Sequence, residues 1–274
     1  MKKLLGAIAA LAMTVGLAAC GTPANQGTTN PNQLVVGMEA GYPPFNWTQN
    51  DDSNGGVKIQ GTNQYAGGYD VEIAKLVAQK LGKELVIVKT EWDGLTPALI
   101  SGKIDAIIAG MSPTEERKAT IDFTDSYYDS QLVLVVKKGS KYEKATSLAD
   151  FAGAKVTAQL NTFHYSVIDQ IPGVDKQAAM DNFPAMRVAL QAGTIDAYVS
   201  ELPEAQSAQS ANSDFVMVKL TDGFKASPED TQTAVGVKKD SPLTKEINEA
   251  LKTISSEERL QIMQDAIKNQ PAAE

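Results

Sequence analysis

The nine residues 98–106, ALISGKIDA, return 91 positions later as residues 189–197, ALQAGTIDA, with six of the nine positions identical. In each copy an apolar helical segment meets a glycine, and a short apolar strand follows. Because glycine readily takes the left-handed conformation that closes a helix, each copy predicts a helix, a turn at Gly102 or Gly193 and a strand. The repeated unit indicates two α/β lobes, while the alternative is that helix–glycine–strand is a general α/β pattern and the match arose by chance.

Predicted strands and helices alternate over the rest of the chain, which favours mainly parallel sheets. Apolar periodicity predicts strands over 34–38, 84–88, 104–109, 131–136, 155–159, 177–180, 195–199, 215–218 and 233–237. It predicts helices over 70–81, 94–101, 114–120, 162–170, 186–192, 204–211, 243–252 and 257–268. The polar residues 48–67 predict a surface excursion with a hairpin around Asn54-Gly55-Gly56.

The N-terminus predicts export. Residues 1–19 combine a basic start with a short apolar run, which indicates a signal peptide rather than a membrane span. Cys20, the only cysteine, follows small residues in a stretch that resembles a bacterial lipobox. That resemblance implies a lipid-anchored Cys20, whereas an ordinary signal peptide with an incidental cysteine is the alternative. Residues 20–33 have no large apolar side chain and predict a flexible tether.

Composition disfavours several classes of function. The formal net charge is −8 and no basic cluster stands out, so nucleic acid is not an expected partner. His164 is the single histidine, and no cysteine–histidine cluster, nucleophile elbow or phosphate-binding glycine loop is present. We therefore expect neither a metal nor a cofactor, while carboxylate chemistry stays open.

The segments after the two repeated strands carry groups suited to a zwitterion. Ligands of open α/β sheets bind beyond the carboxyl ends of strands, where Gly110-Met111-Ser112 and Ser200-Glu201 lie. Arg117 could hold a carboxylate and Glu201 an ammonium group, while Thr162 opens a helix whose free N–H groups favour an anion. Taken singly, Arg117 and Glu201 also fit solvated surface charges, and Thr162 fits a plain helix cap.

Longer motifs resemble the polar amino-acid solute-binding family of ABC importers. They are Tyr42-Pro43-Pro44-Phe45, Gly67-Gly68-Tyr69-Asp70-Val71, Trp92-Asp93-Gly94-Leu95, and the run from Gly102 to Tyr128 that contains Gly110-Met111-Ser112-Pro113-Thr114-Glu115-Glu116-Arg117. The resemblance covers nearly all of residues 34–270. It implies the type II periplasmic-binding-protein-like fold, with two mainly parallel sheets joined by two crossing strands near 128–130 and 230–233. Lobe 1 would comprise 34–128 plus 234–270, and lobe 2 would comprise 131–230.

The same resemblance implies roles for individual residues. Arg117, with Thr162 and Phe163, would bind the ligand's α-carboxylate, and Gly110, Ser112 and Glu201 would bind its α-ammonium; Met111 lies in the same loop. Tyr42 and Trp92 would enclose the side chain, and Glu39 would reach its tip. Glu39 and Glu201 stand where the family often has aspartate, and Asn161 stands where it commonly has glycine. Because Glu39 lies beside aromatic faces, arginine or lysine is the favoured ligand and glutamine the next.

The implied protein is a monomeric, non-enzymatic binding lipoprotein, exported and anchored to the outer face of the cell membrane or to its periplasmic side. It would deliver its amino acid to the importer's membrane permease. Two alternatives stay open. One is a cyclohexadienyl-acid dehydratase on the same fold, with Glu39 or His164 as general acid, and the other is a sensing or adhesive lipoprotein.

Overall fold

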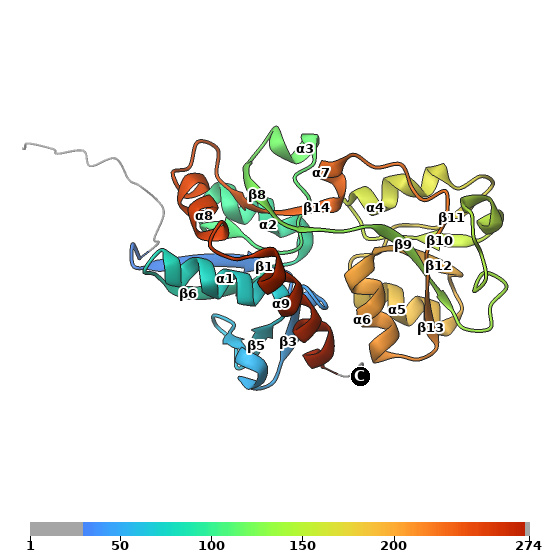
Figure 1. Cartoon of the computed structure of the whole chain (residues 1–274), viewed down its shortest axis with the longest axis horizontal. Coiled ribbons are helices and arrows are strands. Elements are labelled where there is room, and N and C mark those ends of the chain that lie inside the picture. The colour runs from blue at the N-terminus through green and yellow to red at the C-terminus, as the bar shows by residue number, and fades with distance from the viewer. Residues whose placement is uncertain (1–29, 272–274) are drawn as a thin grey trace, which may run out of the picture.

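The structure, a computed structural model, describes residues 30–271. The predicted signal peptide, Cys20 and the tether up to residue 29 lie outside the described residues. Two five-stranded sheets form the two lobes, which lie side by side along the long axis of the molecule (Figure 1). Within residues 30–271 we find no helix with the length and apolar character needed to cross a bilayer.

The first sheet has the strand order β6-β1-β7-β14-β8. Its strands are β1 (Gln33–Met38), β6 (Glu84–Lys89), β7 (Ala106–Ile107), β8 (Asp122–Asp129) and β14 (Gln232–Val237). Helices α1 (Tyr69–Lys80), α2 (Trp92–Ser101), α3 (Glu115–Lys118), α8 (Leu243–Leu251) and α9 (Ser256–Asn269) belong to this lobe. The apolar residues of β1 are buried because helices cover the sheet, and burying each large apolar side chain contributes about 1.5–3 kcal/mol.

The second sheet has the strand order β11-β10-β12-β9-β13. Its strands are β9 (Leu132–Lys137), β10 (Lys155–Thr157), β11 (Asp175–Lys176), β12 (Ala197–Glu201) and β13 (Phe215–Val218). The helical segments between them are η2 (Leu148–Phe151), α4 (Phe163–Ser166), η3 (Val167–Gln170), α5 (Phe183–Ala192) and α6 (Leu202–Ala211), and α7 (Pro228–Thr231) follows β13. The repeated nonapeptide therefore supplies one helix–turn–strand unit to each lobe.

In each sheet four of the five strands point the same way and one runs antiparallel to its neighbours, so both sheets are mainly parallel in strand direction, as predicted. β1 pairs in parallel with β6 and β7, and β10 pairs in parallel with β11 and β12. β14 runs antiparallel to β7 and β8, and β9 runs antiparallel to β12 and β13. β9 and β14 run antiparallel because the chain comes to each of them from the other lobe. Each strand therefore starts on the side of its sheet where the parallel strands have their carboxyl ends.

Two chain segments connect the lobes (Figure 1). Residues 130–131 join β8 to β9, and α7 leads back into β14. The Ser130 amide donates to the Thr231 carbonyl at 2.9 Å, so the two connections lie side by side where they cross. The crossings coincide with the predicted positions, and the predicted lobe boundaries (34–128 plus 234–270, and 131–230) stay a prediction.

Local backbone geometry confirms the two repeat turns. Gly102 ends α2 with a φ of 80° and Gly193 ends α5 with a φ of 73°, both in the left-handed region. The strands that follow are shorter or shifted. Only Ala106–Ile107 of the predicted 104–109 forms a strand, and the second begins at Ala197. The run 177–180 forms no strand; Met180 makes an isolated bridge with Gln159.

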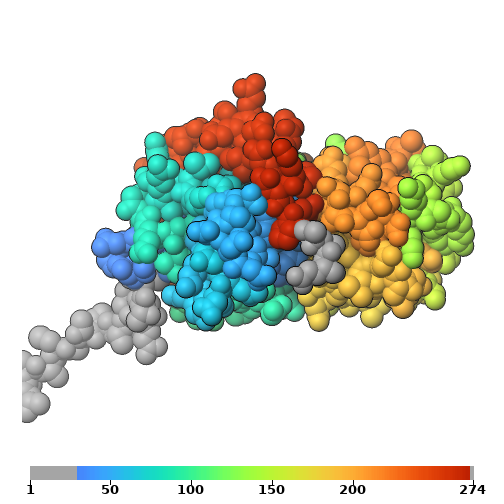
Figure 2. All heavy atoms as spheres, turned by 90° about the horizontal axis from the view of Figure 1, so that it is seen from below, coloured from blue at the N-terminus to red at the C-terminus, as the bar shows by residue number. Residues whose placement is uncertain are grey.

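The excursion over 48–67 forms a small antiparallel sheet of order β2-β3-β5-β4. Its strands are β2 (Gly41–Tyr42), β3 (Asn46–Gln49), β4 (Val57–Lys58) and β5 (Tyr65–Gly67), with the short helix η1 (Ser53–Gly55). The hairpin joins β4 to β5, so its turn lies after Lys58 and not at the predicted Asn54-Gly55-Gly56. Figure 2 shows this blue segment beside the red α9, with the second lobe adjoining α9.

Candidate functional site

Arg117 lies at the boundary between the lobes and contacts both. Thr114 caps α3 by accepting a bond from the Arg117 amide at 3.4 Å, which fixes the start of this one-turn helix. The guanidinium donates to the Ser112 carbonyl at 2.9 Å and to the Asn161 carbonyl of the second lobe at 3.1 Å. Both partners are neutral, and Arg117 forms no ion pair with any of residues 30–271.

The surroundings of Arg117 suit a ligand carboxylate. Its guanidinium carbon lies 5.0 Å from the centre of the Trp92 ring, a cation–π arrangement. Burial lowers the pKa of Arg117 to about 10, partly opposed by the acids Glu116, Asp230 and Glu201. A partly buried guanidinium that has neutral hydrogen-bond partners and no counter-charge suits an anion.

A cavity of about 440 Å³ adjoins Arg117 between the lobes. Five of the predicted site residues line it: Trp92, Met111, Arg117, Thr162 and Phe163. Thr162 precedes α4, and its hydroxyl donates to the Gln159 carbonyl at 2.7 Å. The structure therefore brings together the carboxylate-binding residues that were predicted from separate segments.

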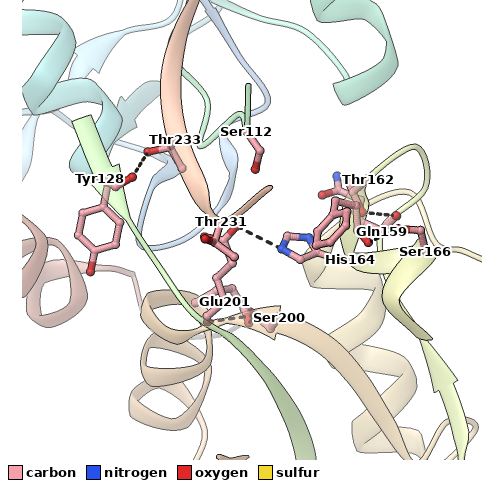
Figure 3. Close-up of polar contacts among 12 residues, drawn as sticks. Ser112, Tyr128, Gln159, Thr162, His164, Ser166, Ser200, Glu201, Thr231 and Thr233 are labelled. Carbon is pink, nitrogen blue, oxygen red and sulfur yellow. Dashed lines mark hydrogen bonds and ion pairs between the residues drawn. The ribbon is translucent and has the colours of Figure 1, made fainter. Parts of the chain in front are cut away.

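Glu201 ends β12 and is fully buried. One carboxylate oxygen lies 3.2 Å from Nε2 of His164, while the other has no hydrogen-bond partner among the described residues. Figure 3 shows the side chain reaching from its strand toward Thr231, with Ser112 across from it. Glu201 is not the solvated surface charge of the alternative interpretation, because it is fully buried, and Arg117 is partly buried beside the cavity at the lobe boundary.

Gly110 and Ser112 follow the carboxyl end of β7, the central strand of the first sheet. Gly110 has a φ of 62°, and a Cβ there would lie 2.7 Å from Cε1 of Tyr42, so both the conformation and the space require glycine. The Gly110 amide donates to the Tyr127 hydroxyl at 3.1 Å, which in turn donates to the buried Asp70 at 2.7 Å. Burial raises the pKa of Asp70 to about 7. This network fixes the loop whose acceptors are predicted to face an ammonium group.

Tyr42 lies away from the cavity beside Arg117, in contrast to the predicted pairing with Trp92 around one side chain. Its ring stacks on Phe45 at 4.9 Å and, across the lobe boundary, on Phe183 at 4.4 Å. Both faces of Tyr42 are therefore covered by aromatic rings in this structure. Trp92 lines the cavity, with Arg117 over its ring.

Glu39 is buried, with 5% of its surface exposed, and is also bonded across the lobe boundary. Its Oε2 accepts from Nε2 of Gln159 at 3.1 Å. Burial raises the pKa of Glu39 to about 7, the Gln159 hydrogen bond acting in the opposite direction. The sequence analysis missed both Gln159 and Phe183. Gln159 could have been found, because it lies two residues past the end of β10 and ligands bind beyond strand ends. No sequence signal distinguished Phe183 from a core residue.

Asn161 stands where the resembling family commonly has glycine, and its backbone has a φ of 54°, in the left-handed region that glycine favours. Asparagine tolerates the left-handed region better than most residues. Its carbonyl accepts from Arg117 and from the Trp92 indole, and its side chain donates to Asp93 at 2.9 Å. Asn161 thus ties the second lobe to the first around the cavity.

The chain is similar to known proteins of one bacterial family. Residues 34–267 match the bacterial extracellular solute-binding proteins, family 3. The arginine-binding extracellular protein ArtP of Bacillus subtilis (strain 168) is 29% identical over 263 residues, covering 95% of this chain and 96% of ArtP. The glutamine-binding protein GlnH of the same organism is 30% identical over 282 residues, covering 99% of this chain and all of GlnH.

A solved structure is similar in fold as well as sequence. The amino acid ABC transporter substrate-binding protein AbpA of Streptococcus pneumoniae Canada MDR_19A, bound to L-arginine, superposes with a TM-score of 0.74 and 28% identity, over 86% of this chain and 95% of AbpA. The α/β two-lobed architecture is therefore the type II periplasmic-binding-protein fold that was predicted. Together, the family match over nearly the whole described chain and the shared architecture show that this protein belongs to the bacterial extracellular solute-binding proteins, family 3.

Proposed function

We propose that this protein binds a free polar L-amino acid between its lobes and delivers it to the permease of an ABC importer. The observation that carries the proposal is the pair of opposite charges at the lobe boundary, a partly buried guanidinium and a fully buried carboxylate. Arg117 has no ionic partner among residues 30–271, and Glu201 has one carboxylate oxygen without a hydrogen bond. The ligand's α-carboxylate would pair with Arg117 and its α-ammonium with Glu201, and these bonds would favour closure of the lobes.

Arginine or lysine is the favoured ligand, with glutamine next. Glu39 provides a buried acid at the lobe boundary, and we assign the end of a cationic or amide side chain to it. The names of relatives support arginine and glutamine within this range, since ArtP is an arginine-binding protein, GlnH is a glutamine-binding protein and AbpA was solved with L-arginine. Thr162, Phe163, Gly110, Met111 and Ser112 complete the proposed site around the amino-acid head group.

Isothermal titration calorimetry with a panel of amino acids tests the proposal. Arg117→Ala should weaken binding of the preferred amino acid at least about 100-fold, because a buried carboxylate would lose its charged partner. Lys118→Ala, the next residue along α3, is the matched control and should bind like the wild type. A wild-type protein that binds no amino acid would contradict the function, and an unchanged affinity in Arg117→Ala would remove Arg117 from the site.

We also propose export and lipid anchoring at Cys20 to the outer face of the cell membrane, or to its periplasmic side. The supporting observation is the sequence alone, with Cys20 directly after a predicted signal peptide. Labelling of cells with radioactive palmitate should mark the wild-type protein, and Cys20→Ser should be unlabelled and released from the membrane fraction. Equal labelling of both proteins would refute this anchor.

A further inference from the structure

His164 is the single histidine of the chain, and the proposed function gives it no role. It belongs to α4, and only 8% of its surface is exposed. Its Nε2 lies 3.2 Å from Oε1 of the fully buried Glu201, the carboxylate assigned to the ligand's ammonium group (Figure 3). The ring of Phe183 lies nearly perpendicular to the imidazole, with 6.3 Å between the ring centres. A basic side chain is thus held in direct contact with the proposed ammonium-binding acid.

Each member of this pair has one buried atom without a hydrogen bond. An ionised carboxylate only accepts hydrogen bonds, so the contact places a proton on Nε2 of His164. The other ring nitrogen, Nδ1, has no partner among residues 30–271, and neither has Oε2 of Glu201. The neutral ring therefore fixes Oε1 and leaves Oε2 to the ligand. A second proton would have to sit on Nδ1, where no described residue accepts it.

The other titratable side chains of the second lobe around α4 have partners of their own. Tyr165, the next residue of α4, donates to the Gln177 carbonyl at 3.0 Å. Two ion pairs of 2.8 Å lie on neighbouring elements: Asp169 with Lys176, and Glu204 with Arg187. Among residues 30–271, Glu201 is the acid that lies within hydrogen-bond distance of the imidazole.

The charge of Glu201 also acts on titratable groups of the first lobe. They are Tyr42, Asp70, Arg117 and Tyr128. Burial raises the pKa of both tyrosines and lowers the pKa of Arg117 to about 10, so these three groups keep their charges between pH 5 and pH 8. Burial raises the pKa of Asp70 and of Glu39 to about 7, so both acids do titrate in this range. A test of His164 therefore has to cancel the contributions of these two acids.

We propose that His164 is a positioning residue that makes ligand binding sensitive to acid: its neutral ring orients Glu201 for the ligand's ammonium group, and its protonated ring competes with that group. This inference rests on the proposed function, since it concerns the regulation of the same site. Both positive charges are attracted to one carboxylate and repel each other, so Glu201 cannot bind them independently. Binding of the amino acid therefore favours the neutral ring and releases the proton on Nδ1 to the solvent.

The size of the effect follows from this competition. Histidine gains its charge between pH 8 and pH 5, so acid acts on the site within this range. A proton that binds the free protein and not the complex weakens affinity by at most about 10-fold per pH unit. We expect His164 to contribute a loss of affinity of about 10-fold between pH 7.5 and pH 5.5, separate from the contributions of Glu39 and Asp70.

Calorimetry with L-arginine at pH 7.5 and pH 5.5 tests the inference. His164→Gln keeps an N–H donor for Glu201 but does not gain a proton in this range. The wild type should lose about 10-fold more affinity than His164→Gln between the two pH values, because the contributions of Glu39 and Asp70 are common to both proteins and cancel. His164→Leu has no donor and should bind L-arginine more weakly than His164→Gln at pH 7.5. Tyr165→Phe, at the next position of α4, is the control and should keep the pH profile of the wild type.

Proton NMR gives a second measurement that needs no substitution at His164. Because the chain has one histidine, the imidazole signals of the protein without a histidine tag report this ring alone. With saturating L-arginine these signals should change from their neutral to their acidic positions at a lower pH than in the free protein. This measurement decides the question if circular dichroism shows that both His164 variants are unfolded.

Each outcome decides a separate point. An equal loss of affinity in the wild type and His164→Gln, or histidine signals whose pH response is the same with and without L-arginine, would overturn the role of His164. If L-glutamine binds and L-arginine does not, the same comparisons are made with L-glutamine. A wild type that binds no amino acid at either pH contradicts the proposed function instead.

Discussion

Glu39→Gln should change how the stability of this protein depends on pH. The pKa of Glu39 rises from an ordinary 4.5 to about 7 because the side chain is buried, which disfavours the charged form. Between these two values the folded state holds a proton on Glu39 that the unfolded state has released. The contribution of Glu39 to the free energy of unfolding therefore falls as pH rises from about 4.5 to about 7.

The size of this effect follows from the two pKa values. A difference of one pH unit corresponds to about 1.36 kcal/mol, so the ionised Glu39 costs about 3 kcal/mol at pH 8. Glutamine keeps the size of the side chain and its contact with Gln159 but cannot ionise. Glu39→Gln should therefore gain stability relative to the wild type as pH rises, with the gain reaching about 3 kcal/mol above pH 7.

Urea unfolding at several pH values from 4.5 to 8 measures this difference without added ligand. Subtracting the two curves removes the contributions of other groups, including the buried Asp70, whose pKa burial also raises to about 7. Glu257→Gln, at an exposed position of α9, is the control and should run parallel to the wild type. Parallel curves for Glu39→Gln and the wild type would refute the burial argument.

Ligand binding should show the opposite trend with pH. A cationic side chain at Glu39 stabilises the ionised carboxylate, so arginine affinity should fall as pH drops below about 7. Calorimetry in buffers of different ionisation enthalpy would also detect the proton released on binding. An arginine affinity that is flat from pH 5 to pH 8 would mean that Glu39 does not contact the ligand's cation.

Two further predictions concern the frame of the site. Arg187→Met should lower the free energy of unfolding, measured in urea, by about 3–5 kcal/mol, because the fully buried Glu204 would lose its ion pair. The double variant Arg187→Met with Glu204→Gln should recover part of this loss. A double variant as unstable as the single variant would contradict this cause. Asn161→Ala should be about 1–2 kcal/mol less stable than Asn161→Gly in the same assay, because both lose the bond to Asp93 but only alanine is strained at a φ of 54°. The reverse order would show that backbone strain is not the cause.

Local sequence patterns predicted the positions of most helices and strands. The strand over 215–218 forms as predicted, and the predicted helix over 70–81 is observed as α1 within one residue at each end, because their periodicity is clear and glycine ends the helix. The start of α5 was misplaced by three residues. Asn182 caps this helix by accepting from the Ala185 amide at 2.9 Å, with Pro184 in its first turn, so the capping pattern and not the apolar spacing marks its start.

The sequence also identified which segments carry charges suited to a zwitterion. Arg117, Thr162 and Glu201 were selected because parallel strands end at one edge of a sheet, and the structure places all three at the lobe boundary. Their proposed roles stay predictions until binding is measured.

Local sequence determines the secondary structure, the repeated unit and the loops that follow its strands, since these depend on neighbours a few residues away. Tertiary structure alone decides the contacts between lobes. The stack of Tyr42 on Phe183, the bond from Gln159 to Glu39 and the bond from Arg117 to the Asn161 carbonyl join residues 44 to 141 positions apart. No periodicity encodes such pairs, because they depend on how the two crossing segments set one sheet against the other.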